Sequence, residues 1–309
     1  MVMQLHRKSG SIVLRVFGIA ASILCCTYVV VTIYRTGALQ IVSQSILKDP
    51  SAFALVIALY VLSCLGIAAA FAFLVWGLSA GQRLRADIIG IHAVTQIAKY
   101  LPTNTLHFVG RHTFLRQRGL SDVALIGAGV SEVALLLLAA VGLATLAASD
   151  ELARHIESKQ GSLAITGGVM VALVLIAAAS IRGDLAALIS PFLTWRAGAG
   201  AMAALSMYCV FFALSGVILW VLLTHAIPAP TPPGIGRLMS YAAMSWSIGF
   251  VSPGAAAGIG VRETMLIFLL GGTVEPAAAT SAAVAYRVVT TLGDVITCAL
   301  GRIWWRARH

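Results

Sequence analysis

Six apolar runs, each long enough to cross a membrane as a helix, dominate this chain of 309 residues. A helix rises about 1.5 Å per residue and the hydrocarbon core of a bilayer is roughly 30 Å thick, so a span needs about 20 apolar residues. The candidate spans are 12–34, 52–78, 123–148, 163–181, 199–223 and 277–304. Charged residues make up only 10% of the chain, against about 25% in soluble domains. The sequence therefore predicts an all-α polytopic membrane protein, with 1–309 as a single integral membrane domain.

Two further apolar segments, 88–101 and 238–251, hold 14 residues each and are too short to cross. Each leads into a turn at a proline, Pro102 or Pro253, and is followed by another short apolar arm. We therefore expect two re-entrant helical hairpins beside the six spans. Non-helical backbone at membrane depth is tolerated only where protein or a water-filled cavity surrounds it, so the two hairpin tips should line a central site.

The order span, span, hairpin, span occurs twice, first in 1–148 and again in 149–309. Because each unit contains three full spans, the second unit enters the membrane upside down. An arginine follows each tip proline by nine residues, at Arg111 and Arg262, and a threonine follows two residues later in both units. We expect an inverted repeat with broken helices near the midplane, an architecture found in secondary transporters.

The distribution of basic residues predicts the orientation. The 21 Lys and Arg residues outnumber the 11 Asp and Glu residues, but they flank the apolar runs, so no nucleic-acid partner is expected. With both hairpins returning to their starting side, thirteen basic residues fall on one side and five on the other. The remaining three, Lys99, Arg262 and Arg287, fall at membrane depth. Both termini are predicted to be cytoplasmic, and the protein is expected in a bacterial inner membrane.

The strongest local signal is the glycine-rich break of the second hairpin. Its glycines let the backbone turn tightly, and the following half-helix offers free N–H groups and a positive dipole end to an anion. Arg262 adds a full charge there. Alternatively, Glu263 caps the helix and pairs with Arg262 or another cation, in a purely structural role. The candidate binding residues of this segment are Pro253, Gly254, Gly258, Gly260, Arg262 and Glu263.

The first hairpin tip supplies a second cation, together with a phenol, a hydroxyl and an amide that can bind oxygen atoms. The alternative for Lys99 is that its ammonium group snorkels to an interface. For Arg111, on the returning arm, the alternative is a positive-inside anchor at the cytoplasmic edge. The candidate binding residues here are Lys99, Tyr100, Pro102, Thr103, Asn104 and Arg111.

Two full spans contain further ionisable candidates, Glu132 in the third span and Tyr286, Arg287 and Asp294 in the last. Arg287 and Asp294 are seven residues apart and share a helix face, so both can point into the bundle. A buried salt-bridge network is the alternative. Even so, the cations at membrane depth outnumber the carboxylates, which favours an anionic ligand.

Enzymatic signatures are missing from the sequence. His92, His107 and His112 do not have the spacing of a metal site, and the five cysteines lie inside apolar stretches. No phosphate-binding P-loop, zincin motif or nucleophile elbow occurs. We expect a protein that is not an enzyme and that has no cofactor and no metal.

Two elements of the sequence resemble the membrane domain of the lysylphosphatidylglycerol synthases, a family of flippase-like domains, and the resemblance extends over nearly the whole chain. The first is Lys99-Tyr-Leu-Pro102 with Gly110-Arg111, Gly119-Leu-Ser121 and Glu132, and the second is Pro253-Gly254 with Gly258-Ile-Gly-Val-Arg-Glu263. Tyr286-Arg287 is also similar to a short element in the last helix of that family.

The resemblance implies movement of aminoacylated or other lipids between leaflets, the role assigned to that membrane domain. In the full synthases a cytosolic domain makes those lipids; this chain stops at His309, just past the last span, so synthase activity is not expected. Thr103 stands where the family often has glycine, and three alanines follow Gly254. These departures leave the identity of the lipid open.

The sequence therefore predicts a lipid flippase or scramblase for an anionic phospholipid or a lipid-linked sugar, with the headgroup bound at the midplane between the two hairpin tips. One alternative is a secondary transporter of a small soluble anion. Another is a membrane scaffold for a lipid-modifying enzyme, in which the polar groups are mainly structural. The expected partners are the lipid substrate and either such an enzyme or further copies of the chain.

Overall fold

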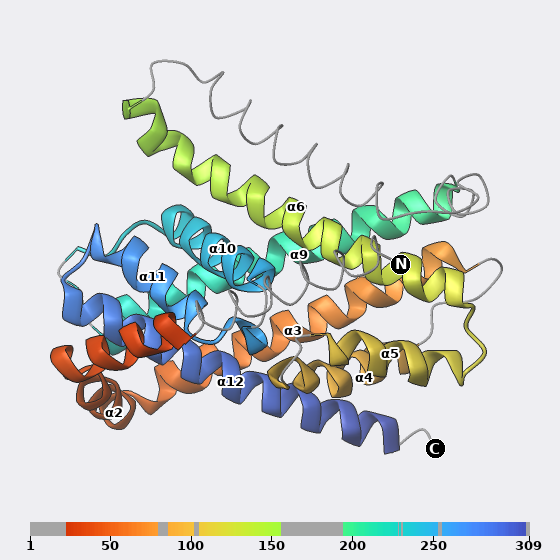
Figure 1. The fold of residues 1–309 in the computed structure, drawn as a ribbon, viewed down its shortest axis with the longest axis horizontal. Coiled ribbons are helices and arrows are strands. Elements are labelled where there is room, and N and C mark those ends of the chain that lie inside the picture. The colour runs from red at the N-terminus through yellow and green to blue at the C-terminus, as the bar shows by residue number, and fades with distance from the viewer. Residues whose placement is uncertain are drawn as a thin grey trace, which may run out of the picture.

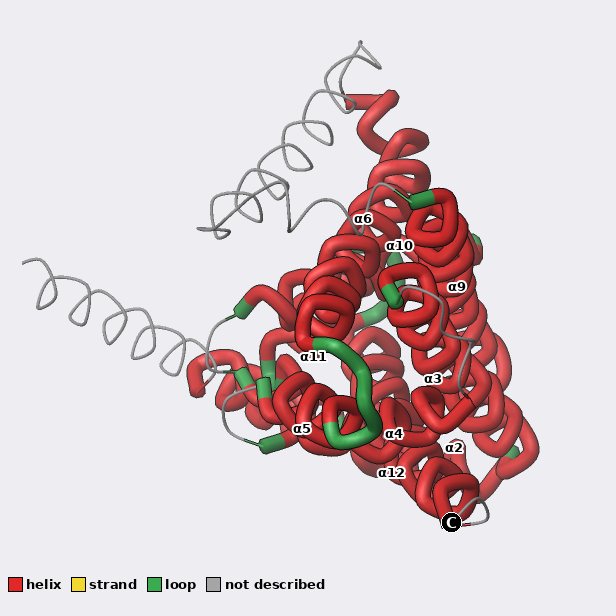
Figure 2. The backbone as a smooth tube through the Cα atoms, turned by 90° about the vertical axis from the view of Figure 1, so that its right-hand side faces the viewer, coloured by secondary structure: helices red, strands yellow, loops and turns green. Residues whose placement is uncertain are grey.

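The computed structural model describes residues 23–79, 86–101, 105–155, 194–227, 229, 231–252 and 255–306, and within these ranges every regular element is a helix (Figure 1). Most of the long helices run along the long axis of the molecule, and Figure 2 shows them nearly end-on. This all-helical fold agrees with the fold class predicted from the apolar runs.

Four helices are long and apolar enough to cross a membrane. They are α3 (Pro50–Leu78), α6 (Asp122–His155), α9 (Trp195–Val221) with its π-helical extension η3 (Leu222–Ala226), and α12 (Pro276–Arg306). They correspond to the spans predicted at 52–78, 123–148, 199–223 and 277–304. These helices are typical of an integral membrane protein.

The two other predicted spans lie wholly or partly outside the described residues. Nothing is described over 163–181, and of 12–34 only the part from residue 23 onward is described. That part belongs to the helix Ile23–Thr36, which is bent by 68° from α2 (Ala38–Lys48). The two helices count as a fifth candidate span only if they are taken together. Helix α2 was not predicted from the sequence.

Short helices occupy the two segments predicted as hairpins. In the first, α4 (Ala86–Thr95) tightens into the 3₁₀ segment η1 (Gln96–Tyr100), and the chain returns as α5 (Leu106–Arg116). In the second, α10 (Ile235–Val251) leads through the 3₁₀ turn η4 (Ala256–Gly258) into α11 (Val261–Gly271). Within each segment the two arms contact each other, and α5 and α11 have 11 residues each, too few to cross a bilayer.

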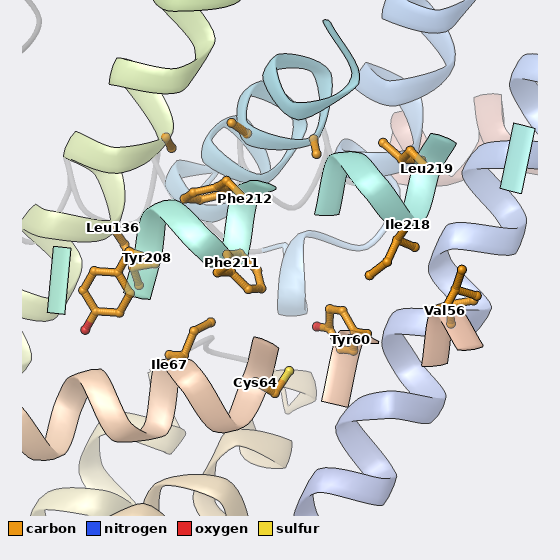
Figure 3. Packing of buried hydrophobic residues seen from close by; sticks show 14 of the residues in the cluster. Val56, Tyr60, Cys64, Ile67, Leu136, Tyr208, Phe211, Phe212, Ile218 and Leu219 are labelled. Atoms are coloured by element: carbon orange, nitrogen blue, oxygen red, sulfur yellow. The ribbon is translucent and has the colours of Figure 1, made fainter. Parts of the chain in front are cut away.

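The centre of the bundle is the interface between α3 and α9. A Cβ atom at Gly200 of α9 would lie 2.6 Å from the Phe73 carbonyl oxygen of α3, so only glycine allows this close approach. Further along the interface, Tyr60 and Cys64 of α3 face Phe211 and Ile218 of α9 (Figure 3). This packing provides a rigid axis against which the shorter helices are held.

The helix contacts are reciprocal between the two halves of the chain. Helix α6 of the first half packs on α10 of the second, and α12 of the second half packs on α4 of the first. Likewise α6 contacts α9, while α12 contacts α3. The same set of neighbouring helices therefore results when each helix is exchanged for its counterpart in the other half: α3 for α9, α4 for α10, α5 for α11 and α6 for α12.

Both ends of the first short-helix segment lie at one end of the bundle. Asp87, at the start of α4, forms a 3.0 Å ion pair with Arg118, just after α5. The Arg118 guanidinium lies 5.6 Å from the ring of Trp305, near the end of α12. At the start of α9, the Arg196 guanidinium lies 4.7 Å from the ring of Trp76, near the end of α3. In Figure 1 these helix ends gather on the right, and they combine tryptophans with arginines as membrane interfaces do.

Candidate functional site

The two helix breaks lie next to each other. Segment η1 contacts η4, although more than 150 residues separate them in the chain. The tips themselves, which contain the predicted site residues Pro102, Thr103, Asn104, Pro253 and Gly254, lie outside the described residues. The other eleven predicted residues are described, and they belong to three groups of contacts.

The first group surrounds Glu263, at the start of α11. Gly258 and Gly260 have positive φ angles of 70° and 82°, conformations that favour glycine, and they allow the chain to turn into the helix. The Gly260 N–H then donates a 2.7 Å hydrogen bond to Glu263 Oε2. The other carboxylate oxygen, Oε1, pairs with Arg287 Nε of α12 at 3.1 Å. Glu263 therefore caps the helix and pairs with a cation, but that cation is Arg287.

Arg262 has no ion pair and no hydrogen bond with any described residue, and its Nε atom is buried without a partner. Its guanidinium lies 5.5 Å from the centre of the Trp246 ring of α10, within cation–π range. The side chain crosses the backbone of Gly258, where a Cβ atom would lie 2.6 Å from Nε. Glycine at 258 thus makes room for the arginine, whose charge is left available to a ligand.

A pocket opens beside Arg262. It contains about 430 Å³ of unfilled space, its open mouth included, and five helices line it. Arg262, Arg287 and Glu263 give the lining a net charge of one positive unit, and Arg287 Nη2 is a second buried donor without a partner. Tyr60, Tyr286 and Trp246 add aromatic surface. A lining with two guanidinium groups and one carboxylate suits an oxyanion, because guanidinium groups bind carboxylate and phosphate through paired hydrogen bonds.

The second group surrounds Asp294, about two turns further along α12 than Arg287. Its Oδ2 atom pairs with Lys99 Nζ at 2.8 Å and accepts a 2.6 Å hydrogen bond from the Tyr100 hydroxyl, both from η1. Its Oδ1 atom accepts a 3.4 Å bond from Tyr60, which also lines the pocket. The Arg287 guanidinium lies 5.6 Å from the Tyr100 ring, so the Glu263 and Asp294 groups are continuous. Arg287 and Asp294 share a helix face as predicted, but each pairs with a different partner.

The third group is closed and lies apart from the pocket. Arg111 Nη1 of α5 pairs with Glu132 Oε2 of α6 at 2.5 Å, and His92 Nε2 of α4 lies 2.9 Å from Glu132 Oε1. Arg111 Nη2 also donates a 3.3 Å hydrogen bond to the Gln96 side chain of η1. The Arg111 guanidinium lies 4.4 Å from the Phe71 ring. All three charged or imidazole side chains are at most 4% exposed. Arg111 Nη1 and the Glu132 carboxylate thus pair with each other inside the protein, while Arg111 Nε is buried without a hydrogen-bond partner. The cytoplasmic-edge alternative for Arg111 stays a prediction.

Several site residues were missed at the sequence level. Tyr60 and Trp246 lie in apolar spans and look like ordinary core or interface aromatics, so no sequence pattern distinguishes them. His92 was considered only as a metal or acid–base residue, and it is a neighbour of Glu132. No group of three or more His, Cys, Asp or Glu side chains able to hold a metal occurs within the part of the chain that is described.

Comparison with models of known protein families gives no match for this chain, and comparison with curated proteins gives none either. The function is therefore inferred from the geometry of the three groups and from the pocket at Arg262.

Proposed function

We propose that this chain is a lipid flippase or scramblase that binds the headgroup of an anionic phospholipid or lipid-linked sugar in the pocket at Arg262, while the acyl chains stay in the bilayer. The observation that supports this most is the unpaired guanidinium of Arg262 inside an apolar bundle. A charge at membrane depth costs about 2.5–3.5 kcal/mol on insertion scales, and at Arg262 no ion pair or hydrogen bond with a described residue offsets that cost; the Trp246 ring and the neighbouring Glu263 carboxylate offset only part of it. A ligand anion would offset it.

The proposed architecture has six spans and two re-entrant hairpins arranged as an inverted repeat of 1–148 and 149–309. The reciprocal contacts of α3, α4 and α6 with α9, α10 and α12 support the repeat. The Asp87–Arg118 ion pair supports the first hairpin, because it joins the start of one arm to the end of the other. The adjacency of η1 and η4 supports a site near the midplane, where secondary transporters bind their substrates between broken helices.

Each part of the site has a proposed task. Arg262 and Arg287 bind the phosphate, and Glu263 and Asp294 hold Arg287 and Lys99 in place. Tyr100 and the tip residues contact headgroup hydroxyls. The resemblance to the membrane domain of lysylphosphatidylglycerol synthases supports the same assignment. The proposal also places both termini in the cytoplasm and the protein in a bacterial inner membrane.

The direct test is lipid movement in vesicles of phosphatidylcholine and phosphatidylglycerol. Purified protein is reconstituted with a trace of fluorescent phosphatidylglycerol, and dithionite reports how much label reaches the outer leaflet. Wild type should expose the inner-leaflet label and Arg262→Ala should not. Arg302→Ala, which removes the same charge from an exposed position of α12, should behave as wild type. A wild-type protein that moves no lipid would favour the scaffold alternative.

A secondary transporter of a small soluble anion is the second candidate, because two arginines and one glutamate line the pocket and would attract an anion whatever is attached to it. The same vesicles, loaded with buffer and exposed to radiolabelled phosphate, distinguish the two candidates. Uptake of phosphate without movement of the lipid would assign the site to the soluble anion.

A further inference from the structure

The sequence match between the two halves extends beyond the paired prolines and arginines. Arg262 lies 151 positions after Arg111, just as Pro253 lies 151 positions after Pro102. The same offset carries Glu132 to Ala283. The carboxylate that binds Arg111 in the first half therefore has alanine at the corresponding position of the second half.

The helices around the two arginines correspond in the same way. In the first half, Glu132 reaches Arg111 from α6, beside His92 of α4. In the second half, Ala283 of α12 lines the pocket with Arg262 of α11, beside Ala242 of α10. Each set combines the last span of its half with both arms of its short-helix segment. Where the first set has a buried ion pair, the second has a pocket.

A tyrosine from the opposite half completes each set. Tyr208 of α9 is fully buried and close enough to Glu132 and Arg111 to interact with both electrostatically. Tyr60 of α3 lines the pocket at Arg262. Because α3 and α9 are the helices that exchange with each other in the reciprocal contacts, each set receives its tyrosine from the counterpart helix, although Tyr208 lies 148 positions after Tyr60 and not 151.

We propose that the pocket at Arg262 binds one singly charged oxyanion of a ligand in the place that the Glu132 carboxylate occupies at Arg111. This rests on the proposed function and specifies the chemistry of the group bound. The Arg111 site is neutral with its internal carboxylate, whereas the Arg262 pocket has a net charge of one positive unit. One monoanion neutralises it, so a phosphodiester suits it better than a phosphate dianion. A lipid headgroup or free monoanionic phosphate has this chemistry.

Replacing Ala283 with glutamate tests the correspondence, because it gives the second half the carboxylate of the first. Ala283→Glu should bind Arg262 internally and compete with the ligand. Ala283→Gln has nearly the same size without the charge. In thermal-shift titrations of purified protein with dihexanoyl-phosphatidylglycerol, Ala283→Glu should bind about tenfold or more weakly than Ala283→Gln, the effect expected of a desolvated charge pair. The unliganded Ala283→Glu protein should melt no earlier than Ala283→Gln.

Equal binding by the glutamate and glutamine variants would overturn the proposal, whether both bind the probe or both fail to bind it. The charge at position 283 would then not determine binding. If the glutamate at 283 prevents folding, Ser245→Asp and Ser245→Asn make the same comparison from α10, which lines the pocket from another side. Aspartate there should weaken binding of the lipid probe by the same roughly tenfold relative to asparagine. Equal binding by that pair would overturn the proposal as well.

Two further measurements separate this inference from the flippase function. In the first, sodium phosphate replaces the lipid probe in the same titration. If phosphate alone raises the melting temperature of wild type but not that of Ala283→Glu, the result supports the site with a soluble anion as its ligand. The vesicle assay is then run on the same variants. Wild type that binds the lipid probe but moves no lipid would refute the flippase and leave the oxyanion site standing. Wild type and Ala283→Glu that move lipid equally would refute the site and leave the flippase standing.

Discussion

Arg262 and Arg111, which follow Pro253 and Pro102 by nine residues each, are in opposite situations, and the difference predicts opposite responses to mutation. Arg111 shares a closed ion pair with Glu132, whereas Arg262 has no ion pair with any described side chain and faces a pocket. Removing Arg262 therefore leaves no carboxylate without its partner, because Glu263 keeps Arg287. Removing either member of the Arg111–Glu132 pair leaves a buried charge.

For Arg262, we predict loss of lipid movement without loss of stability. Arg262→Ala should melt within a few degrees of wild type in detergent and move no lipid. Arg262→Lys should recover little movement, because a guanidinium binds phosphate through a planar two-pronged contact and an ammonium acts as a point charge. Thermal unfolding and vesicle transport are measured on the same preparations. An Arg262→Ala protein that melts early, or that still moves lipid at the wild-type rate, would remove Arg262 from the site.

For Glu132, we predict loss of stability. Glu132→Leu leaves the Arg111 guanidinium buried without its carboxylate, and breaking a buried ion pair from one side typically costs about 3–5 kcal/mol. The variant should melt well below wild type. The double variant Arg111→Leu/Glu132→Leu should recover much of the loss, since no charge is then left buried. If the double variant is no more stable than Glu132→Leu, the ion pair is not what makes Glu132 necessary.

At the scale of elements, the start of α3 depends on Asp49. The Asp49 carboxylate accepts a 2.6 Å hydrogen bond from the Ser51 hydroxyl and a 3.0 Å bond from the Ala52 N–H, and both hold the pKa of this carboxyl below its usual value of 3.8. A lowered folded-state pKa means that the stabilisation is present above that usual value and is lost as the pH falls through the folded pKa.

We therefore expect the effect of Asp49→Ala on stability to depend on pH. The variant should melt below wild type at pH 7, where the carboxylate caps the helix. The gap in melting temperature should narrow as the pH is lowered below 3.8, where the wild-type carboxyl becomes protonated. Thermal unfolding of both proteins over this range measures the gap. Gln44→Ala, a change at an exposed position of α2, is the control and should show no such pH dependence relative to wild type. A gap for Asp49→Ala that stays constant with pH would show that capping by the charged form is not the cause.

The contact between η1 and η4 can be tested by crosslinking. Cysteines at Ala98 and Ala256 in a cysteine-free background should be joined by a short bifunctional thiol reagent, because these two segments are in contact. A cysteine at Ser206, on the exposed face of α9, paired with the one at Ala98 serves as the control. Failure of the first pair to react faster than the control pair would contradict the arrangement of the two breaks.

The long helices could be predicted from the sequence because an apolar run of about 20 residues has few alternatives to crossing the bilayer as a helix. The breaks after Tyr100 and Val251 were also predictable, since each precedes a proline turn in a run too short to cross. Helix α2 was not predicted, although its buried residues Ala38, Val42 and Ser45 recur at helical spacing, because its 11 residues are too few to cross the bilayer. A short helix of that kind is stabilised by packing on α12 and α3, which the sequence does not reveal.

The membership of the site was predictable in part, but the pairing within it was not. A charge in an apolar run is conspicuous, and so Lys99, Arg262, Arg287 and Asp294 were found. Their partners depend on which helices meet: the Tyr100–Asp294 hydrogen bond joins residues 194 positions apart. The same reason explains why Glu263 pairs with Arg287 and not with its neighbour Arg262, whose side chain points into the pocket.

At the scale of the whole molecule, one end of the bundle gathers arginines and tryptophans, and we predict that this end faces the cytoplasm. Ala86 opens α4 and Gln117 follows α5, next to the Asp87–Arg118 ion pair, so the two positions belong on the same side of the membrane. Lys48 ends α2, at the opposite end of α3 from Trp76. The excess of basic residues predicted for the first side makes it the cytoplasmic one.

Single cysteines at Ala86, Gln117 and Lys48, each in a cysteine-free background, make this prediction testable in intact cells with a membrane-impermeant thiol reagent. Cysteine at Lys48 should react from outside, because α3 crosses the bilayer between its cytoplasmic end, near Trp76, and the end next to Lys48. Cysteines at Ala86 and Gln117 should react only after the cells are permeabilised, because a re-entrant segment returns to the side from which it enters. Reaction of 86 and 117 from opposite sides would mean that α4 and α5 together cross the membrane, which would reverse every later helix and remove the inverted repeat. Reaction of both from outside would keep the hairpin and invert the whole molecule.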